Sequence, residues 1–251
     1  MTQKYQNKTQ KYRIAKVIAR TGAYSRREAE RMISDRNVTM NGEVVTSPVT
    51  MASFDDDIYI NKIKIPNVSK TKIWILNKPK GFITTANDPQ NRNTVFKLVP
   101  KATNHLIPIG RLDINTEGLL LFTNDGQLSR YMEHPSNKII RKYKIEIDQW
   151  VADDITSKIL GEIQIDGYIY NIAQCKLLSN NKQSSWLTIE IAEGKNREIR
   201  KICKHFNLRI LRLIRISYGP FDLGNIQKGE TLEVKYDQMK AKLNKIGYKI
   251  N

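Results

Sequence analysis

The sequence has few of the residues that metal and thiol chemistry require. Its two cysteines, Cys175 and Cys203, stand far apart and form no CxxC pair, so neither a zinc site nor a disulfide framework is indicated. Its three histidines are scattered and make no HExxH motif, which argues against a zinc protease. We therefore expect no bound metal and, because unpaired cysteines suit a reducing compartment, a cytoplasmic protein.

Glycine-rich nucleotide loops and long apolar runs are missing as well. No GxxxxGK[ST], GxGxxG or GxSxG motif occurs, so the common loops for nucleoside triphosphates and dinucleotides, and the nucleophile of the serine hydrolases, are not indicated. The apolar runs fall short of the roughly 20 residues that span a membrane. Residues 1–10 are polar and lack the apolar stretch of a secretory signal. We expect no cofactor, no membrane association, and a disordered basic tail at residues 1–10.

Positive charge is what the sequence has in excess. It contains 42 Lys and Arg against 25 Asp and Glu, which gives a formal net charge of +17. Such a surface attracts polyanions, and composition favours nucleic acid over an anionic membrane or an acidic protein. Residues 1–36 carry ten basic and three acidic side chains, and residues 194–215 carry eight basic and one acidic. We therefore expect a cationic surface in each half of the chain.

The N-terminal region indicates two short helices. Apolar residues recur at helical spacing between Lys11 and Gly22, with basic residues on the other face. Ser25 and Glu28 have the spacing of a capping box, in which each side chain bonds a free amide of the other residue. This spacing predicts that the second helix begins at Arg26.

A hairpin follows these helices. The run VTMNGEVV, residues 38–45, joins two β-prone pieces through Asn41-Gly42, a dipeptide that tolerates the positive φ angles of a type I′ turn. Together with the preceding RIAKVIARTGAYSRREAERMI it resembles the S4 RNA-binding domain, here residues 11–65, although Asp35-Arg36-Asn37 replaces the family's usual turn. The alternative is a small helical domain whose basic face is merely solvated. The resemblance implies RNA contacts by Arg13, Lys16, Ser25, Arg26, Arg27, Arg31, Arg36 and Asn41.

After a linker at residues 66–71, a second domain is expected at residues 72–251. Strands and helices follow one another there in an irregular order, which predicts an α+β fold with a mainly antiparallel, mixed sheet and not a doubly wound parallel one. The expected strands are residues 74–76 with a continuation at 82–85, 119–123, 142–147, 186–191 and 211–217, and the expected helices are 127–132, 152–160, 197–206 and 237–245.

The stretch GRLDINTEGLLL, residues 110–121, carries polar groups between two apolar segments. A loop held between buried segments can present a reactive side chain rigidly, and Asp113 is the candidate carboxylate in it. Taken alone, an aspartate and a threonine in such a loop are more often structural, since they bond their own turn. The loop by itself therefore leaves both interpretations open.

The same stretch resembles the catalytic signature of the RsuA/RluB-type pseudouridine synthases, in which an S4 domain precedes the catalytic domain. The likeness continues through KPKG (78–81), RKYK (141–144), EGKNREIR (193–200) and LIRISYG (213–219). It implies a small S4-like helix–helix–hairpin domain followed by a pseudouridine synthase domain. It also implies that Asp113 is the catalytic carboxylate and that the protein is a monomer.

Further site residues are implied by their positions in the matching motifs. Isomerising uridine breaks the bond from N1 to the ribose and rejoins the base through C5; the carboxylate could attack the sugar, attack the base or take a ribose proton. Arg200 is expected to hold Asp113 ionised by bidentate contact, with Arg197 as the second choice, against the alternative of a merely basic helix face. Tyr143 is expected to stack on the flipped base and to help move the C5 proton, against the alternative of a core tyrosine. The expected substrate-binding residues are Lys78, Arg111, Thr116, Lys195 and Arg197.

The sequence therefore predicts a cofactor-independent enzyme that converts a uridine of ribosomal RNA into pseudouridine. Large-subunit (23S) RNA is favoured over small-subunit RNA, either as naked RNA or within a ribosomal assembly intermediate. One alternative is a non-catalytic ribosome-binding or assembly factor, which would have no need of Asp113, Tyr143 and Arg200 in matching order. Another is an S4-linked RNA methyltransferase, which would need a cofactor loop that the sequence lacks.

Overall fold

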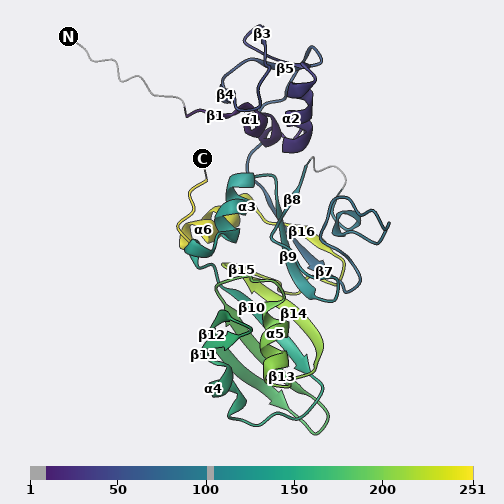
Figure 1. The fold of residues 1–251 in the computed structure, drawn as a ribbon, viewed down its shortest axis with the longest axis vertical. Helices are drawn as coiled ribbons and strands as arrows, with labels where there is room; N and C mark the ends of the chain where they lie inside the picture. Colours follow the sequence, from purple (N-terminus) through teal and green to yellow (C-terminus); the bar gives the residue numbers. More distant parts are fainter. Residues whose placement is uncertain (1–9, 101–104, 251) are drawn as a thin grey trace, which may run out of the picture. The chain divides into compact units, whose positions relative to one another are not determined.

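The computed structural model describes residues 10–100 and 105–250, which fall into two compact units (Figure 1). One unit holds the described residues up to Thr71 together with residues 105–106, and the other unit holds the rest. Of the tail expected at residues 1–10, only Gln10 lies within the described residues, where it is exposed and outside any helix or strand.

Two helices open the first unit: α1, Ile14–Arg20, and α2, Arg26–Ser34. Helix α2 begins where the capping box predicts. The Oγ atom of Ser25 accepts a hydrogen bond from the Glu28 amide at 3.2 Å, and Oε2 of Glu28 accepts one from the Ser25 amide at 2.7 Å. The hydrogen bonds from Ser25 lower the pKa of Glu28. The predicted start of the second helix and both hydrogen bonds of its capping box are therefore confirmed.

Short strands complete the first unit. Residues expected to begin the first helix instead form β1, Tyr12–Arg13, which pairs with β4, Met51–Ala52. The hairpin turn has the predicted type I′ signature, because Asn41 and Gly42 have φ angles of 52° and 88°. Buried aliphatic side chains from both helices and from the sheet form one core. The sheet has the order β3-β2-β5-β6, with β2 at Val38–Met40, β3 at Glu43–Val44, β5 at Ile58–Ile60 and β6 at Ile63–Lys64.

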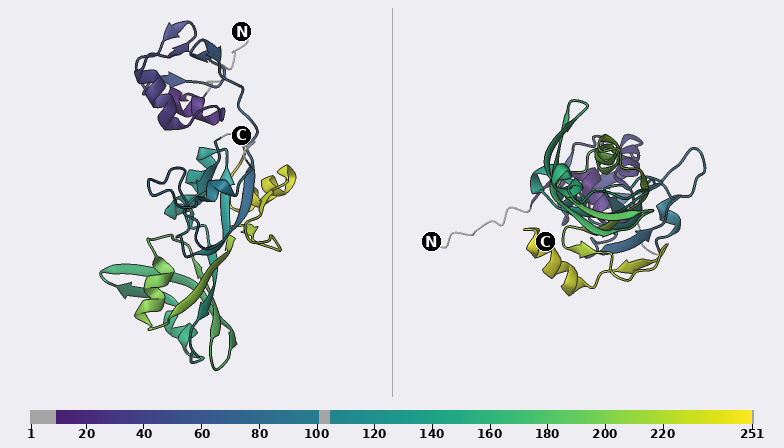
Figure 2. Two further views of the ribbon diagram at one scale, coloured as in Figure 1. Left: turned by 90° about the vertical axis from the view of Figure 1, so that its right-hand side faces the viewer. Right: turned by 90° about the horizontal axis from the view of Figure 1, so that it is seen from below.

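One long, twisted sheet runs through the second unit (Figure 2). Its strand order is β11-β12-β13-β10-β14-β9-β7-β16, with β15 paired to β14 and β8 paired to β9. Among the described residues, every pairing in this sheet is antiparallel except that of β9 with β14. The predicted α+β fold with a mainly antiparallel, mixed sheet is confirmed. The strands are β7 Ile73–Lys78, β8 Ile107–Ile109, β9 Glu117–Thr123, β10 Arg141–Ile147, β11 Gly161–Ile165, β12 Tyr168–Asn180, β13 Ser185–Ile191, β14 Ile210–Tyr218, β15 Phe221–Asp222 and β16 Thr231–Glu233.

The helices of this unit lie near their predicted places, but the predicted strands lack β8, β11, β12, β15 and β16. Residues 82–85 form no strand, and Ile83 makes only an isolated bridge to Thr94. Strands β11 and β12 are not anticipated by the sequence, because much of β12 is exposed on both faces and so lacks hydrophobic alternation. The helices are α3 Gly126–Glu133, α4 Ile155–Ile159, α5 Glu198–His205 and α6 Tyr236–Lys245, with 3₁₀ turns at Val95–Lys97 and Pro135–Asn137.

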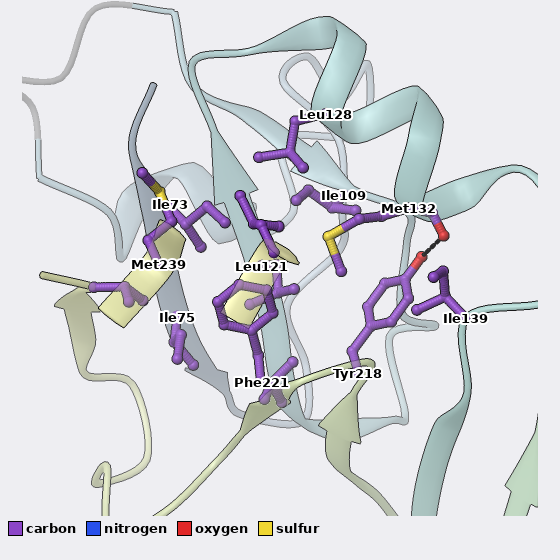
Figure 3. Close-up of a cluster of buried hydrophobic side chains, with 13 residues drawn as sticks. Ile73, Ile75, Ile109, Leu121, Leu128, Met132, Ile139, Tyr218, Phe221 and Met239 are labelled. Atoms are coloured by element: carbon purple, nitrogen blue, oxygen red, sulfur yellow. Dashed lines mark hydrogen bonds between the residues drawn. The ribbon is translucent and has the colours of Figure 1, made fainter. Parts of the chain in front are cut away.

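An apolar cluster joins α3 and α6 to strands β7, β9 and β14 (Figure 3). Met132 of α3, Met239 of α6 and Leu121 of β9 are all buried within it. At its edge, the hydroxyl of Tyr218 donates a hydrogen bond to the Met132 carbonyl at 2.9 Å. This core gives β9 and β14 a rigid support.

Strands β9 and β14 approach each other closely where their parallel pairing begins. Gly118 pairs with Arg215 and has a φ of 97°. A Cβ atom at Gly118 would lie 2.3 Å from the Arg215 carbonyl oxygen and 2.9 Å from its amide nitrogen. Glycine is therefore required at this position. Because it has no side chain, the loop before β9 can pack against β14.

Candidate active site

Asp113 lies in the loop between β8 and β9, and it faces a cleft of about 890 Å³ in the second unit. Strands β8 and β9 pair in antiparallel fashion, and β9 is buried along its whole length. The Asp113 side chain itself is 38% exposed. The loop thus has the predicted arrangement, a polar segment carried by buried strands that leaves one carboxylate accessible.

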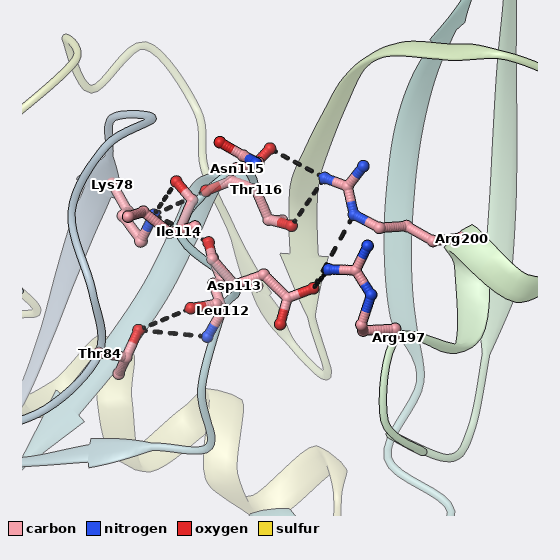
Figure 4. A network of polar contacts seen from close by, with 9 residues as sticks. All are labelled: Lys78, Thr84, Leu112, Asp113, Ile114, Asn115, Thr116, Arg197 and Arg200. Carbon is pink, nitrogen blue, oxygen red and sulfur yellow. Dashed lines mark hydrogen bonds and ion pairs between the residues drawn. The ribbon is translucent and has the colours of Figure 1, made fainter.

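Lys78 lies beneath this loop and organises its backbone (Figure 4). Its side chain is fully buried, and its Nζ atom donates to the carbonyls of Thr116 at 2.8 Å, Asp113 at 3.1 Å and Pro79 at 3.1 Å. Burial lowers the pKa of Lys78 to about 8. The expected role of Lys78 in substrate binding has no support in this position, because its side chain has no exposed surface and does not line the cleft; it holds the loop instead.

Thr84 braces the loop from another side. Its Oγ1 atom donates to the Leu112 carbonyl at 2.9 Å and accepts from the Leu112 amide at 3.3 Å. Within the loop, the Thr116 amide donates to the Asp113 carbonyl at 3.0 Å. The residue before Asp113 and the turn that follows it are thus both fixed by hydrogen bonds (Figure 4).

Two arginines contact Asp113, but not in the way the sequence suggests. Nη1 of Arg197 lies 3.4 Å from Oδ2 of Asp113, whereas the nearest atom of Arg200, its Nε, lies 3.8 Å from the same oxygen. Arg200 instead directs Nη2 to the Asn115 carbonyl at 2.9 Å and to Oγ1 of Thr116 at 3.4 Å. The expected bidentate pair between Arg200 and Asp113 is therefore wrong, and the nearer cation is Arg197.

The two arginines hold different positions at the start of α5. Arg197 is the N-cap of α5 and has a left-handed conformation with a φ of 52°. This conformation directs the chain into α5, whose first turn carries Arg200. Burial lowers the pKa of the Arg200 guanidinium, and the positive charge of Arg197 lowers it further.

The other predicted site residues meet at the same cleft. Tyr143, on β10, is 9% exposed and lines the cleft, where its register partner on β14 is Arg215. Arg111 is exposed at the rim, and Thr116 is buried against Arg200. The residues from the sequence analysis that line the cleft are Arg111, Asp113, Thr116, Tyr143, Lys195, Arg197 and Arg200.

Three buried charged residues of the cleft escape sequence reasoning. Arg215 is 2% exposed and donates through Nε to the Leu119 carbonyl at 2.7 Å. Arg141 is 6% exposed and bonds the hydroxyl of Tyr218 at 2.8 Å. Glu198 is 3% exposed, and burial raises its pKa. Strand alternation offers one usable signal, because Arg141 lies two residues from Tyr143 and so shares its face.

In the first unit, the predicted RNA-binding residues divide into two groups. Ser25 caps α2, and Asn41 donates to Asp56 at 2.9 Å, so these two side chains have structural roles. Hydrogen bonds from the Asn41 side chain and the Ser53 amide lower the pKa of Asp56. The side chain of Lys16 lies over a tyrosine ring. Exposed guanidinium groups are supplied by Arg13, Arg26, Arg27, Arg31 and Arg36. RNA contact by any of these residues stays a prediction.

Neither a metal centre nor a membrane-spanning helix is found in the part of the chain that the structure describes. Over residues 10–100 and 105–250, no group of three or more His, Cys, Asp or Glu side chains could hold a metal ion. Over the same residues, no helix has the length and apolar character needed to cross a membrane.

Comparison with known proteins identifies the family. The pattern of the RNA pseudouridylate synthases matches residues 72–205, and that of the S4 domain matches residues 13–58. An uncharacterised RNA pseudouridine synthase of Rickettsia bellii is 43% identical over 222 residues, which cover 88% of this chain and 96% of the relative. Ribosomal large subunit pseudouridine synthase B of Bacillus subtilis is 32% identical over 230 residues, covering 91% and 94%.

A solved structure shows the same fold. The crystal structure of a pseudouridylate synthase aligns with a TM-score of 0.64 at 24% identity, and the alignment covers 92% of this chain and 99% of the other. The chain therefore belongs to the RNA pseudouridylate synthase family, in the RsuA/RluB-type group with an N-terminal S4 domain, and is an enzyme that isomerises uridine to pseudouridine in RNA.

Proposed function

We propose that this enzyme modifies a uridine of large-subunit ribosomal RNA, with Asp113 as its catalytic carboxylate and with no cofactor. The choice of RNA is supported by relatives in Bacillus subtilis and Haemophilus influenzae that are named for the large ribosomal subunit. The choice of residue is carried by one observation. Asp113 is a half-exposed carboxylate with two guanidinium groups within 4 Å, in the cleft that Tyr143 also lines.

The reaction balances without an external reagent. The bond from C1′ to N1 breaks, the uracil turns, and a bond from C1′ to C5 forms. The proton on C5 leaves and N1 gains one, so there is no net oxidation or reduction. A carboxylate, a base-stacking ring and a means of moving one proton are therefore sufficient.

The ionised carboxylate of Asp113 starts the reaction. It can attack C1′ of the ribose, attack the uracil ring, or remove a ribose proton, and each route needs the negative charge. Arg197 and Arg200 stabilise this charge in a cleft that the substrate would close to water. The four braces on the loop, from Lys78, Thr84, Arg200 and the Thr116 amide, keep the carboxylate in place while the base moves.

The RNA has to deliver one unstacked uridine to this cleft. Extruding a base costs a few kcal/mol, and Tyr143 offers a ring on which the extruded uracil can stack. The exposed arginines of the S4 domain bind phosphates and so contribute affinity without reading the target base.

Mapping of pseudouridine tests the proposal. Ribosomal RNA and ribosomal assembly intermediates from a strain that lacks the enzyme are treated with the wild type, with Asp113→Asn, and with Asp222→Asn. Asp222 is an exposed carboxylate on β15 and serves as the matched control. We expect one new pseudouridine in the 23S RNA with the wild type and the control, and none with Asp113→Asn. Full product from Asp113→Asn would remove the assigned role, and a modified 16S uridine would correct the substrate.

A further inference from the structure

The hairpin between β11 and β12 lies beside the basic helix α5 (Figure 1). It carries an exposed aromatic side chain, that of Tyr168. Tyr168 is 59% exposed and directly follows the turn at Asp166 and Gly167, whose φ angles are 52° and 77°. The Nζ atom of Lys201, on α5, lies 5.3 Å from the centre of the Tyr168 ring. We refer to Tyr168 and Lys201 together as the hairpin platform.

Helix α5 connects the hairpin platform to the catalytic carboxylate. The Lys201 amide donates to the Arg197 carbonyl at 3.0 Å, so the two residues lie about one helical turn apart, about 6 Å along the axis. Arg197 in turn contacts Asp113 at 3.4 Å. A strip of positive charge therefore runs from the active site to the hairpin platform.

A second connection fixes the hairpin itself. Lys195, which lines the cleft, donates from Nζ to the Ile169 carbonyl and forms an ion pair with Glu193. The same ammonium lies 5.5 Å from the ring centre of Tyr170, which is buried on the same face as Tyr168. These contacts connect the start of β12 to the cleft-lining segment around Lys195.

An exposed aromatic ring flanked by cations suits single-stranded nucleic acid. Any base can stack on such a ring, while lysine and arginine side chains bind the phosphates on either side. We propose that the hairpin platform binds an unpaired nucleotide that neighbours the target uridine, with its base stacked on Tyr168 and its phosphate on Lys201. This inference rests on the proposed function, since it assigns a place to the RNA that carries the uridine.

A double-mutant cycle between protein and RNA tests it. The substrate is a synthetic RNA that contains the mapped uridine, with a single abasic site placed at each of the three positions on either side. We expect Tyr168→Ala to raise KM and Kd about fivefold to 100-fold, the range that stacking of one base gives, with kcat unchanged. Tyr168→Phe keeps the ring and should leave both constants near wild type. One abasic position should weaken wild-type binding by a similar factor and should not add to the effect of Tyr168→Ala.

Matched controls separate stacking from other effects. Trp150→Ala removes an aromatic side chain that is 57% exposed but lies between β10 and α4, outside the hairpin and α5, and it should leave KM unchanged. Lys201→Gln should lower the salt dependence of binding, because one phosphate is no longer neutralised by the protein. Thermal unfolding shows whether the Tyr168 variants keep the fold.

The outcomes can be told apart. If the wild type forms no pseudouridine in ribosomal RNA, the proposed function fails and this inference falls with it. If the wild type is active and Tyr168→Ala has the wild-type KM and Kd, only the inference fails. A defect seen on protein-containing ribosomal particles but not on naked RNA would also overturn it and would point to a ribosomal protein at this surface.

Discussion

Arg197 is the cation closest to Asp113, with 3.4 Å between Nη1 and Oδ2. Arg200 stands at 3.8 Å and gives its remaining hydrogen bonds to the Asn115 carbonyl and to Thr116. The side chain of Arg197 is 53% exposed and that of Arg200 only 19%. The two arginines therefore have separable functions: Arg197 supplies charge to the carboxylate, and Arg200 also holds the loop that bears it.

Substitution of each arginine should separate these functions. We expect Arg197→Ala to lower kcat/KM about tenfold to 100-fold and to leave Tm nearly unchanged, because exposed ion pairs contribute about 0–1 kcal/mol. Arg200→Ala should lower kcat/KM further and also lower Tm, since removing hydrogen bonds from a charged group costs about 1.5–3 kcal/mol. Lys204→Ala, on the exposed face of α5, is the control. Equal melting temperatures for the two arginine variants would contradict the division.

The sequence could predict the parts of this site but not their geometry. The capping box at Ser25 and the Asn41-Gly42 turn follow from local backbone chemistry, and the structure confirms both. Strands β9, β10, β13 and β14 follow from hydrophobic periodicity. Arg197, the closer of the two arginines to Asp113, has a left-handed backbone conformation. Arginine has no preference for the left-handed conformation, so the sequence gives no sign of it. A motif can therefore include both arginines and still not show which of them lies closer to Asp113.

The burial of Lys78 could not be predicted from the sequence either. A lysine in a short turn motif is usually exposed, and only the fold shows that four carbonyls converge on its Nζ atom. The same holds for Arg215, whose place depends on the parallel pairing of β14 with β9. Contacts between strands that lie about a hundred residues apart leave no local trace in composition or spacing.

Because β9 and β14 approach each other closely, we expect a methyl group added at Gly118 to lower the free energy of unfolding strongly. Gly118→Ala puts a Cβ atom 2.3 Å from the Arg215 carbonyl, and the strands have to separate. Gly161 is a matched control, because its φ of 90° is as strained for alanine but nothing lies within 4 Å of the added atom. We expect Gly161→Ala to cost about 1–3 kcal/mol from backbone strain and Gly118→Ala more than about 4 kcal/mol. Urea unfolding measures both, and similar midpoints would show that the approach is not tight.

Lys78 predicts opposite responses of stability and activity to alkaline pH. Burial lowers its pKa from 10.5 to about 8, so between these values the unfolded chain holds more protons than the native one. The contribution of Lys78 to the free energy of unfolding therefore becomes more favourable as the pH rises from about 8 to about 10.5. The neutral amine has only two N–H groups for three close carbonyls, so the loop is less firmly held and kcat should fall.

Lys78→Met provides the comparison. The difference in unfolding free energy between wild type and variant, measured in urea from pH 7 to 9.5, should move in favour of the wild type as the pH rises. The variant should lack the alkaline fall in kcat and should have a low kcat throughout, because four carbonyls lose the lysine donor. A pH-independent difference in stability would mean that Lys78 is not the titrating group.

We expect substitutions in the S4 unit to weaken RNA binding without changing the chemical step. Arg27 and Arg31 are exposed on α2. We expect the double substitution to glutamine to raise KM, leave kcat unchanged and reduce the slope of log Kd against log salt by about 0.7 to 0.9 for each phosphate that the protein no longer neutralises. Lys62→Gln removes an exposed cation from the β5–β6 turn of the same unit and is the control. An unchanged salt slope for the double variant would place the RNA elsewhere on this unit.

Tyr143 allows stacking and proton transfer to be separated, because each uses a different part of the side chain. Tyr143→Phe keeps the ring, so KM should stay near the wild-type value, while removal of the hydroxyl should lower kcat about 100-fold if that group moves the C5 proton. Tyr143→Ala should also raise KM, since stacking of one base contributes about 1–3 kcal/mol. Tyr170→Phe, at a buried position under the hairpin, is the control.

Uridine deuterated at C5 completes the test of Tyr143. Removal of the C5 proton should limit the rate of the Tyr143→Phe variant and give it a larger isotope effect than the wild type. A Phe variant with full kcat and no isotope effect would restrict Tyr143 to stacking and leave the C5 proton to another group of the cleft.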